Sequence, residues 1–201
     1  MEENLIEKMN VFDFRSKLLQ EDDIAAISKT RKYKLMKKNE LVAKFTLEWD
    51  LFQDVTCLEF LIVNEKSLPF YIYQDPSDSS LMRWLEGRFI PKNRRFVEEI
   101  LSTLGDFSEP KLVKMLDITK ALSLTDDYWV LKEGEDCIWE RYNLYDNDFS
   151  ETLSSIAFTG YKGKYKTISS SPEFTTNGML KKCWRRIENK VFLYKGGTEG
   201  A

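Results

Sequence analysis

The first part of the chain is marked by the alternation of apolar and polar residues that is typical of β-strands. Residues 41–49 alternate in their second half, and residues 56–63 are rich in amino acids that favour strands. Residues 68–73 show the same tendency, with a proline at the beginning of the run, where a strand tolerates it. Together the three runs predict an antiparallel sheet with short connections.

The segment that precedes these strands, residues 1–40, is polar and rich in charge. Within it, the alternation at residues 11–14 predicts an opening strand. The acids at the start of residues 22–27 favour a short helix, because negative charge suits a first helical turn. Residues 31–34 contain three basic side chains and predict a connector.

Helical spacing replaces alternation after residue 77. Residues 77–80 offer N-caps for a helix over residues 81–85 that ends at Gly87. Pro91 is placed to begin a second helix, because its fixed φ suits a first turn. A third helix is predicted to start near residues 109–110. The apolar residues that keep helical spacing in these two helices are Phe96, Val97, Ile100, Leu101, Leu104, Leu112, Val113, Leu116, Ile118, Ala121 and Leu122.

Aromatic residues become dense in the second half. Residues 128–131 predict a strand, and residues 139–149, rich in Trp, Tyr, Asn and Asp, predict a surface cover that packs its rings over a core. Ser150 can cap a short helix that contains Leu153 and Ile156.

Two strand-like runs, residues 179–187 and 191–194, surround an Asn-centred turn and predict a β-hairpin. A Gly-rich stretch follows at once. The predicted fold class is therefore α+β: an antiparallel sheet with packed helices, ending in a β-hairpin and a Gly-rich loop. We place a domain boundary between residues 1–122 and 123–201.

Histidine is absent from the chain. This excludes Ser-His-Asp and Cys-His catalysis and all His metal ligands. Metal chemistry would have to use oxygen ligands, as magnesium does with nucleotides. Cys57, Cys137 and Cys183 are odd in number and far apart, which indicates free thiols in a reducing compartment rather than disulfides or a zinc site.

Two further features bear on location and partners. No apolar run is long enough to cross a membrane, and the acidic start has no secretory signal, so we expect a cytoplasmic protein without a membrane partner.

The net charge is −3. The segment from Thr159 onward contains nine basic and three acidic residues, which leaves it at about +6 and the rest of the chain at about −9. A basic end suits an anionic ligand, although surface lysines more often only solvate a loop.

The Gly-rich stretch comprises Gly196, Gly197, Thr198, Glu199 and Gly200. Glycines let backbone N–H groups converge on a phosphate, and a threonine hydroxyl adds a donor. The Walker pattern of a lysine and a hydroxyl residue after the last glycine is not matched. The sequence leaves two interpretations open: the front part of a longer nucleotide-binding protein, or a frayed tail.

Three other groups of residues have candidate chemistry. Arg88, Arg94 and Arg95 could hold an anion, but internal salt bridges to Glu86, Glu98 and Glu99 are the preferred interpretation. The paired acids could bind magnesium, but their contexts favour turns; they are Asp126, Asp127, Asp136, Asp146 and Asp148. The aromatics could stack nucleobases, but without interleaved basic residues direct nucleic-acid binding is not expected; they are Trp129, Trp139, Tyr142 and Tyr145.

The order and spacing of three stretches resemble the N-terminal part of HipA-like (CtkA-related) serine/threonine protein kinases, over most of residues 55–201. The first stretch is residues 84–94. The other two are residues 123–130 with Trp139, 143–145 and 147–150, and residues 171–178 with Lys182, Trp184 and 193–197.

The resemblance implies a role for the C-terminal part of the chain. In such kinases a final hairpin of the N-terminal lobe leads into the phosphate loop over ATP and Mg²⁺, so residues 123–201 would begin that lobe and residues 196–200 would be the loop. Some members phosphorylate a hydroxyl residue of this loop, which makes Thr198 the candidate here. The ATP-anchoring lysine, the catalytic Asp and the metal-binding Asn and Asp lie after the loop in the family. We therefore expect no phosphate transfer and no tight ATP or Mg²⁺ binding by residues 1–201 alone.

Two alternatives remain open. The chain could be a stand-alone, non-catalytic interaction or regulatory module, such as an antitoxin-like partner of a split HipA kinase. It could also be a phage-associated binding protein. A reading frame that continues beyond Ala201 into a lysine-bearing strand favours the kinase, with the C-terminal kinase lobe as its partner. A stop codon there favours a module with a separate protein partner.

Overall fold

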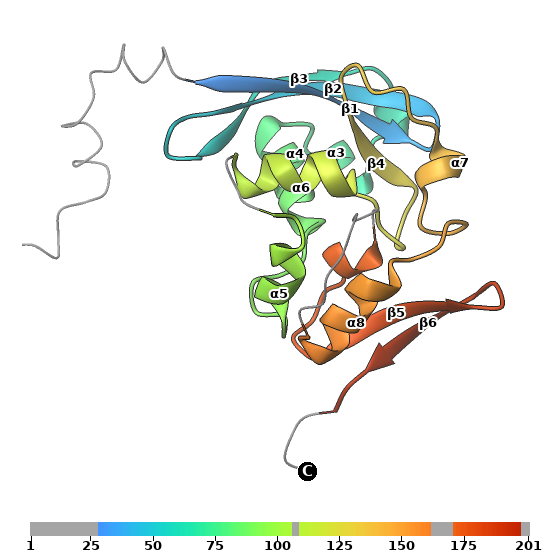
Figure 1. The fold of residues 1–201 in the computed structure, drawn as a ribbon. Coiled ribbons are helices and arrows are strands. Elements are labelled where there is room, and N and C mark those ends of the chain that lie inside the picture. The colour runs from blue at the N-terminus through green and yellow to red at the C-terminus, as the bar shows by residue number, and fades with distance from the viewer. Residues whose placement is uncertain (1–27, 106–108, 162–170, 198–201) are drawn as a thin grey trace, which may run out of the picture.

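The computed structural model describes residues 28–105, 109–161 and 171–197 (Figure 1). Its largest element is a four-stranded antiparallel sheet in the order β3-β2-β1-β4. The strands are β1 (Lys29–Lys37), β2 (Glu40–Trp49), β3 (Val55–Ile62) and β4 (Tyr128–Lys132). A separate antiparallel hairpin is formed by β5 (Lys182–Ile187) and β6 (Lys190–Lys195). The fold is α+β, as the sequence predicts.

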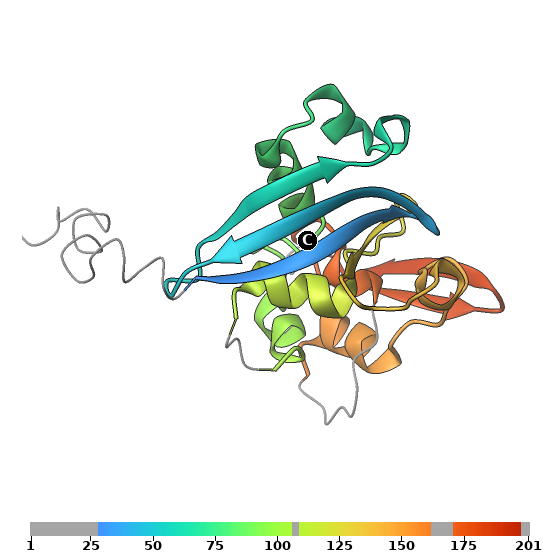
Figure 2. The same ribbon diagram turned by 90° about the horizontal axis from the view of Figure 1, so that it is seen from above.

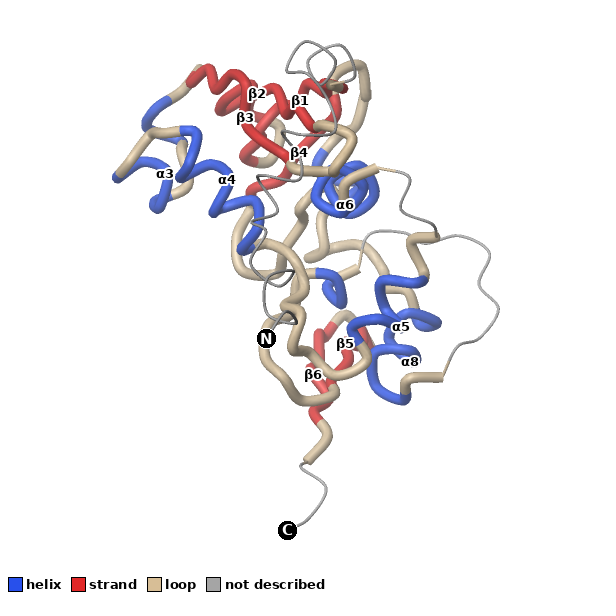
Figure 3. Tube along the Cα trace, turned by 90° about the vertical axis from the view of Figure 1, so that its left-hand side faces the viewer, coloured by secondary structure: helices blue, strands red, loops and turns tan. Residues whose placement is uncertain are grey.

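Helices fill the space between the sheet and the hairpin (Figures 1 and 3). Helices cover one face of the sheet, and no helix of the described residues lies over the other face, which is seen from above in Figure 2. The helices next to the sheet are α3 (Phe70–Gln74), α4 (Asp78–Gly87) and α6 (Lys111–Thr119). Those next to the hairpin are α5 (Val97–Ser102) and α8 (Glu151–Thr159), and the short elements are η1 (Glu65–Ser67), α7 (Trp139–Tyr142) and η2 (Pro172–Phe174).

The sheet follows from the period-two pattern of β1 and β2. Tyr33, Leu35, Phe45 and Leu47 are buried on the helix side, while Lys44 on the opposite side is exposed. Fixing this alternation also fixes the register, because a slip by one residue would turn every apolar side chain of the strand outward. The predicted strands at residues 41–49, 56–63 and 128–131 are confirmed by β2, β3 and β4.

Two helix starts predicted from their caps are confirmed. The Ser77 side chain accepts the N–H of Ser80 at 3.2 Å at the start of α4. Ser150 accepts the N–H of Leu153 at 3.2 Å at the start of α8. Each serine thereby satisfies a backbone donor that has no partner inside the helix. The third helix, α6, also begins where predicted, after Pro110.

The connector predicted at residues 31–34 is wrong, because these residues belong to β1. Arg31 points to the helix side, where it donates to Asp117 of α6 at 2.5 Å and to Glu109 at 3.0 and 2.8 Å. The Tyr33 hydroxyl donates to the same Asp117 at 2.8 Å. A half-buried, inward-facing position filled by a paired cation breaks the apolar alternation, which hid the strand in the sequence.

Two predictions that relied on prolines are also wrong. Residues 68–73 form no strand: Pro69 precedes α3, and its C=O accepts the N–H of Tyr73 at 2.9 Å. An apolar run of six residues is too short for its periodicity to distinguish a strand from a helix. Pro91 begins a turn closed by the N–H of Arg94 at 3.1 Å, and α5 starts only after Phe96, whose φ of 61° is left-handed and interrupts helical geometry.

Other expectations have mixed outcomes. Instead of covering a core, the side chains of Trp139, Leu144 and Phe149 are part of one, packed with Trp129.

The strand predicted at residues 11–14 and the helix predicted at residues 22–27 lie outside the described residues. The boundary at residue 122 stays a prediction; β4 follows it in sequence and pairs with β1. In the described part of the chain, no helix has the length and hydrophobicity required to span a bilayer.

The buried face of the sheet yields a stability prediction. We expect Leu47→Ala to lower the free energy of unfolding by about 2–5 kcal/mol, because Leu47 is fully buried and its loss leaves a cavity. Leu61→Ala on β3 is the matched control, since that side chain is 51% exposed, and should change stability by less than about 0.5 kcal/mol. Urea unfolding of both variants measures the difference, and equal losses would contradict the assignment of the buried face.

Candidate functional site

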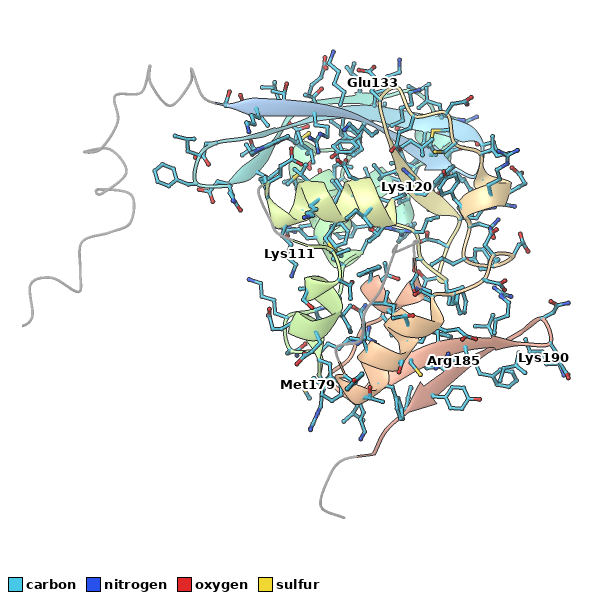
Figure 4. All side chains as sticks on the ribbon, in the orientation of Figure 1. Lys111, Lys120, Glu133, Met179, Arg185 and Lys190 are labelled. Carbon is cyan, nitrogen blue, oxygen red and sulfur yellow. The ribbon has the colours of Figure 1, made fainter. Side chains whose placement is uncertain are left out.

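The β5–β6 hairpin predicted around an Asn-centred turn is confirmed, and the turn is one residue shorter than the predicted span of residues 188–190. Ile187 pairs with Lys190, and the intervening Glu188 and Asn189 have φ values of 48° and 63°. Two consecutive left-handed residues define a type I′ turn, whose twist matches that of paired strands. Figure 4 shows Lys190 at the tip of this hairpin.

The predicted phosphate loop begins where β6 ends. The Gly196 N–H donates to the Lys181 C=O at 2.9 Å, one position beyond the last strand pair, so the chain stays beside β5 up to this glycine. A Cβ on Gly196 would collide with the Lys181 side chain, whereas a Cβ on Gly197 would meet no atom of the described residues within 4 Å. Thr198, Glu199 and Gly200 lie outside the described residues.

The two edges of the hairpin differ. Trp184 is opposite Leu193 in a pair whose backbone groups point away from the partner strand. Its N–H donates to Glu173 Oε1 at 2.7 Å, and its C=O accepts from Ser154 Oγ at 2.8 Å. The outer edge of β5 is therefore bonded to η2 and α8.

The β6 side of the hairpin is uncovered. In the described part of the chain, β6 pairs only with β5. Val191, Phe192 and Tyr194 are 37%, 41% and 45% exposed. An apolar strand with an unpaired edge is a surface to which another strand can add.

A buried ion pair fixes the position of this hairpin. Arg94 Nη2 lies 2.8 Å from Glu173 Oε2, and neither side chain is exposed to solvent. Arg94 also donates to the C=O groups of Glu173 at 2.6 Å and Lys182 at 3.0 Å. Burial raises the pKa of Glu173, and the hydrogen bonds from Trp184 and Arg94 oppose that rise. One guanidinium thus links the turn before α5, η2 and β5.

Arg88 is held in the same manner. It donates to both carboxylate oxygens of Asp126 at 2.8 and 3.0 Å and to the Ala121 C=O at 2.6 Å. Its guanidinium lies 4.5 Å from the centre of the Trp84 ring. The preferred interpretation of Arg88 and Arg94 as internally bonded is therefore confirmed, but their partners are distant in sequence and not the neighbouring glutamates. Arg95 lies over the ring of Phe96 at 5.4 Å.

Among the acidic candidates, Asp126 has a structural role. Asp126 pairs with Arg88 and also accepts the Tyr128 N–H at 3.1 Å, which is the turn role preferred from the sequence. The structure does not bring Asp126 and Asp127 together with Asp136, Asp146 or Asp148 as a ligand set: within the described ranges, no three Cys, Asp or Glu side chains are grouped to hold a metal ion.

The aromatic residues pack on one another. The ring centres of Trp129 and Trp139 are 5.9 Å apart, those of Trp129 and Tyr142 are 6.0 Å apart, and those of Trp139 and Tyr145 are 6.2 Å apart. Trp129 is fully buried, and its Nε1–H donates to the Lys38 C=O at 2.6 Å. Trp129 and Trp139 are core residues, as preferred from the sequence, whereas Tyr142 and Tyr145 pack against them and are 37% and 41% exposed.

A polar cavity of about 540 Å³ is the feature that sequence reasoning missed. The three stretches on which the family resemblance rests meet around it. Its lining consists of Trp84, Gly87 and Arg88, then Ser123, Thr125 and Asp126, then Thr175 and Asn177, together with Tyr71 and Arg83. The only sequence signal was the concentration of small polar residues at 123–127 and 171–178.

Comparisons with known proteins add no relative. No family model matches the chain, and neither a curated protein nor a solved structure matches it significantly.

The Arg94–Glu173 pair yields a stability prediction. We expect Arg94→Ala to lower the free energy of unfolding by about 3–5 kcal/mol, because it leaves a buried carboxylate without its partner. Arg141→Ala, on the exposed surface of α7, should cost less than about 0.5 kcal/mol. Denaturant unfolding measures both. Equal stability of the two variants would show that the pair does not hold the hairpin in place.

Proposed function

We propose that the chain is the N-terminal segment of a HipA-like serine/threonine protein kinase and contributes the loop that covers the phosphates of ATP. One observation carries the proposal: a β-hairpin, bonded along β5 and uncovered along β6, leads directly into Gly196 and Gly197. In the kinases that the chain resembles, a hairpin of this kind leads into the phosphate loop.

The surroundings of Gly197 support this role, whereas the Gly196 N–H is already bonded to the Lys181 C=O. No atom of the described residues lies within 4 Å of a Cβ position on Gly197, which leaves room for an oxygen-rich ligand to approach its backbone. Backbone N–H groups in such a loop bind phosphate without a charged side chain. Lys195 and Lys181 flank the position and add positive charge.

In this proposal residues 1–201 do not transfer phosphate by themselves. The resemblance assigns the ATP-anchoring lysine and the Mg²⁺-binding Asn and Asp to sequence that follows the loop. Phosphoryl transfer depends on positioning and electrostatic stabilisation by those groups. ATP and Mg²⁺ are therefore cofactors of the assembled kinase, and the C-terminal lobe is the main partner of this segment.

A second candidate uses the same uncovered strand. The β6 edge with Val191, Phe192 and Tyr194 also suits a strand supplied by another protein. The chain would then be a non-catalytic module that regulates a separately encoded kinase core or another partner.

Gly197 provides a direct test of the loop. We expect ATP–Mg²⁺ to bind residues 1–201 weakly and to shift the backbone amide NMR signals of Gly196 and Gly197. Gly197→Val should weaken binding at least about tenfold, or about 1.4 kcal/mol, because the side chain blocks the approach to the backbone. Asn189→Gly changes the opposite end of the hairpin and should leave binding unchanged. Strong binding that survives Gly197→Val would remove the loop from the proposal.

Thr198 provides a second test. If the loop is also a site of autophosphorylation, mass spectrometry of the active, full-length form should find phosphate on Thr198, and Thr198→Ala should abolish that modification. Phosphate found only on other residues would contradict the assignment.

A further inference from the structure

The outermost strand of the large sheet, β3, has an edge that no other described strand covers. In the described part of the chain β3 pairs only with β2, and Figure 2 shows it, in teal, as the outer one of the strands seen from above. The Val63 N–H donates to the Val42 C=O at 2.9 Å. Because backbone direction alternates along an antiparallel strand, the N–H and C=O groups of Phe60 and Ile62 point away from β2. No described residue bonds to these outward groups, and we call this surface the β3 edge.

Apolar side chains lie next to the β3 edge on both faces of the sheet. Leu61, on the outer face, is 51% exposed, and Ile62, on the helix side, is 38% exposed. Leu58 and Val63 are 58% and 55% exposed. An added strand would obtain main-chain hydrogen bonds from the edge and would cover apolar side chains on either face.

The charge of β3 differs from that of the other strands. Among the described strands, β3 alone contains neither Lys nor Arg, and the exposed Glu59 is its only charged residue. Proteins commonly protect an open edge with lysines, which repel a basic strand. The β3 edge has no such protection against a basic partner.

The elements that border β3 are strongly acidic. Residues 40–87, which form β2, β3, η1, α3 and α4, contain nine acidic and three basic residues, a balance of −6 in a chain of net charge −3. Burial and then the carboxylate of Asp78 raise the pKa of Cys57 to about 11, which places an acid of α4 directly beside β3. The exposed Lys32 lies on β1, two strand spacings or about 10 Å from β3, where salt screens its charge.

This acidity disfavours two occupants that the chain itself could supply. Residues 1–27 contain seven acidic and three basic residues, so their net charge has the same sign as that of the edge. The β3 strand of a second copy carries the same Glu59 and the same acidic surroundings. Like charges that face each other across paired strands are destabilising, whereas opposite charges stabilise the pair. The electrostatics of the edge are therefore complementary to a basic segment from elsewhere.

We propose that the β3 edge binds an extended, basic segment of a partner protein as an additional strand. The backbone of the segment bonds to the outward groups of Phe60 and Ile62, and its aliphatic side chains pack beside Ile62 on the helix side. A Lys or Arg side chain lies next to Glu59 on the outer face, with its apolar stem over Leu61. This role goes beyond the phosphate loop and does not use β6.

Ile62 allows the edge to be blocked while β2 and β3 stay paired. Its N–H points away from β2, so Ile62→Pro removes a donor that the sheet does not use, in a position where an edge strand tolerates proline. Ile62→Val keeps the donor and is the matched control. Glu59→Lys reverses the charge of the edge. Glu133→Lys, just beyond β4 at the opposite side of the sheet, is its charge-matched control (Figure 4).

The test titrates the 201-residue chain into a fluorescent short peptide that alternates lysine and valine, and follows fluorescence anisotropy. We expect binding that weakens as salt rises, and slower hydrogen exchange at the amides of Phe60 and Ile62 in the complex. Ile62→Pro and Glu59→Lys should each weaken binding at least about tenfold. Ile62→Val and Glu133→Lys should bind as the unchanged chain does.

Several outcomes overturn the proposal. Absence of binding, equal binding of a peptide that alternates glutamate and valine, or unchanged binding by Ile62→Pro would each do so. Self-association of the chain that Ile62→Pro abolishes would assign the edge to a second copy instead, and sedimentation measures it. Thermal unfolding confirms that the variants are folded, and if Ile62→Pro is not, the comparison of Glu59→Lys with Glu133→Lys decides the outcome.

Discussion

A guanidinium and a carboxylate lie side by side in the interior, where neither is reached by solvent, and they link the β5–β6 hairpin to the rest of the molecule. Arg94 and Glu173 come from segments 79 residues apart. Each would be strongly destabilising if buried alone. Because the carboxylate also accepts the Trp184 N–H, the pair determines where β5 lies as well as how the chain before α5 turns.

This constraint explains why the hairpin has two different sides. On the β5 side, the N–H and the C=O of Trp184 point away from β6, and both are bonded within the molecule, to Glu173 and Ser154 respectively. On the β6 side apolar side chains remain exposed. A hairpin that is rigidly held on one edge and open on the other is suited to present the following loop to a second structural unit. The proposed phosphate-loop role and the proposed role as an interaction module both use this asymmetry.

The sequence predicted the elements whose signals are local. Ser77 and Ser150 cap their helices as expected, and the Asn-centred turn at Asn189 closes the hairpin. The failures have tertiary causes. Arg31 occupies an inward position of β1 only because Asp117 and Glu109 meet it from α6 and the residues before it. The partners of Arg88 and Arg94, and the cavity where three stretches converge, depend on residues distant in sequence, and no local pattern specifies such pairs.

The central claim is that the hairpin and the glycines after it belong to a kinase whose remaining parts follow in the same chain. Determining the DNA sequence downstream of the codon for Ala201 tests this claim most directly. The account predicts an open reading frame of roughly a hundred codons or more, the size of a further domain, with a lysine-bearing strand first and catalytic Asp and Asn residues later. A stop codon directly after Ala201 would contradict it and would favour the interaction module with a separately encoded partner.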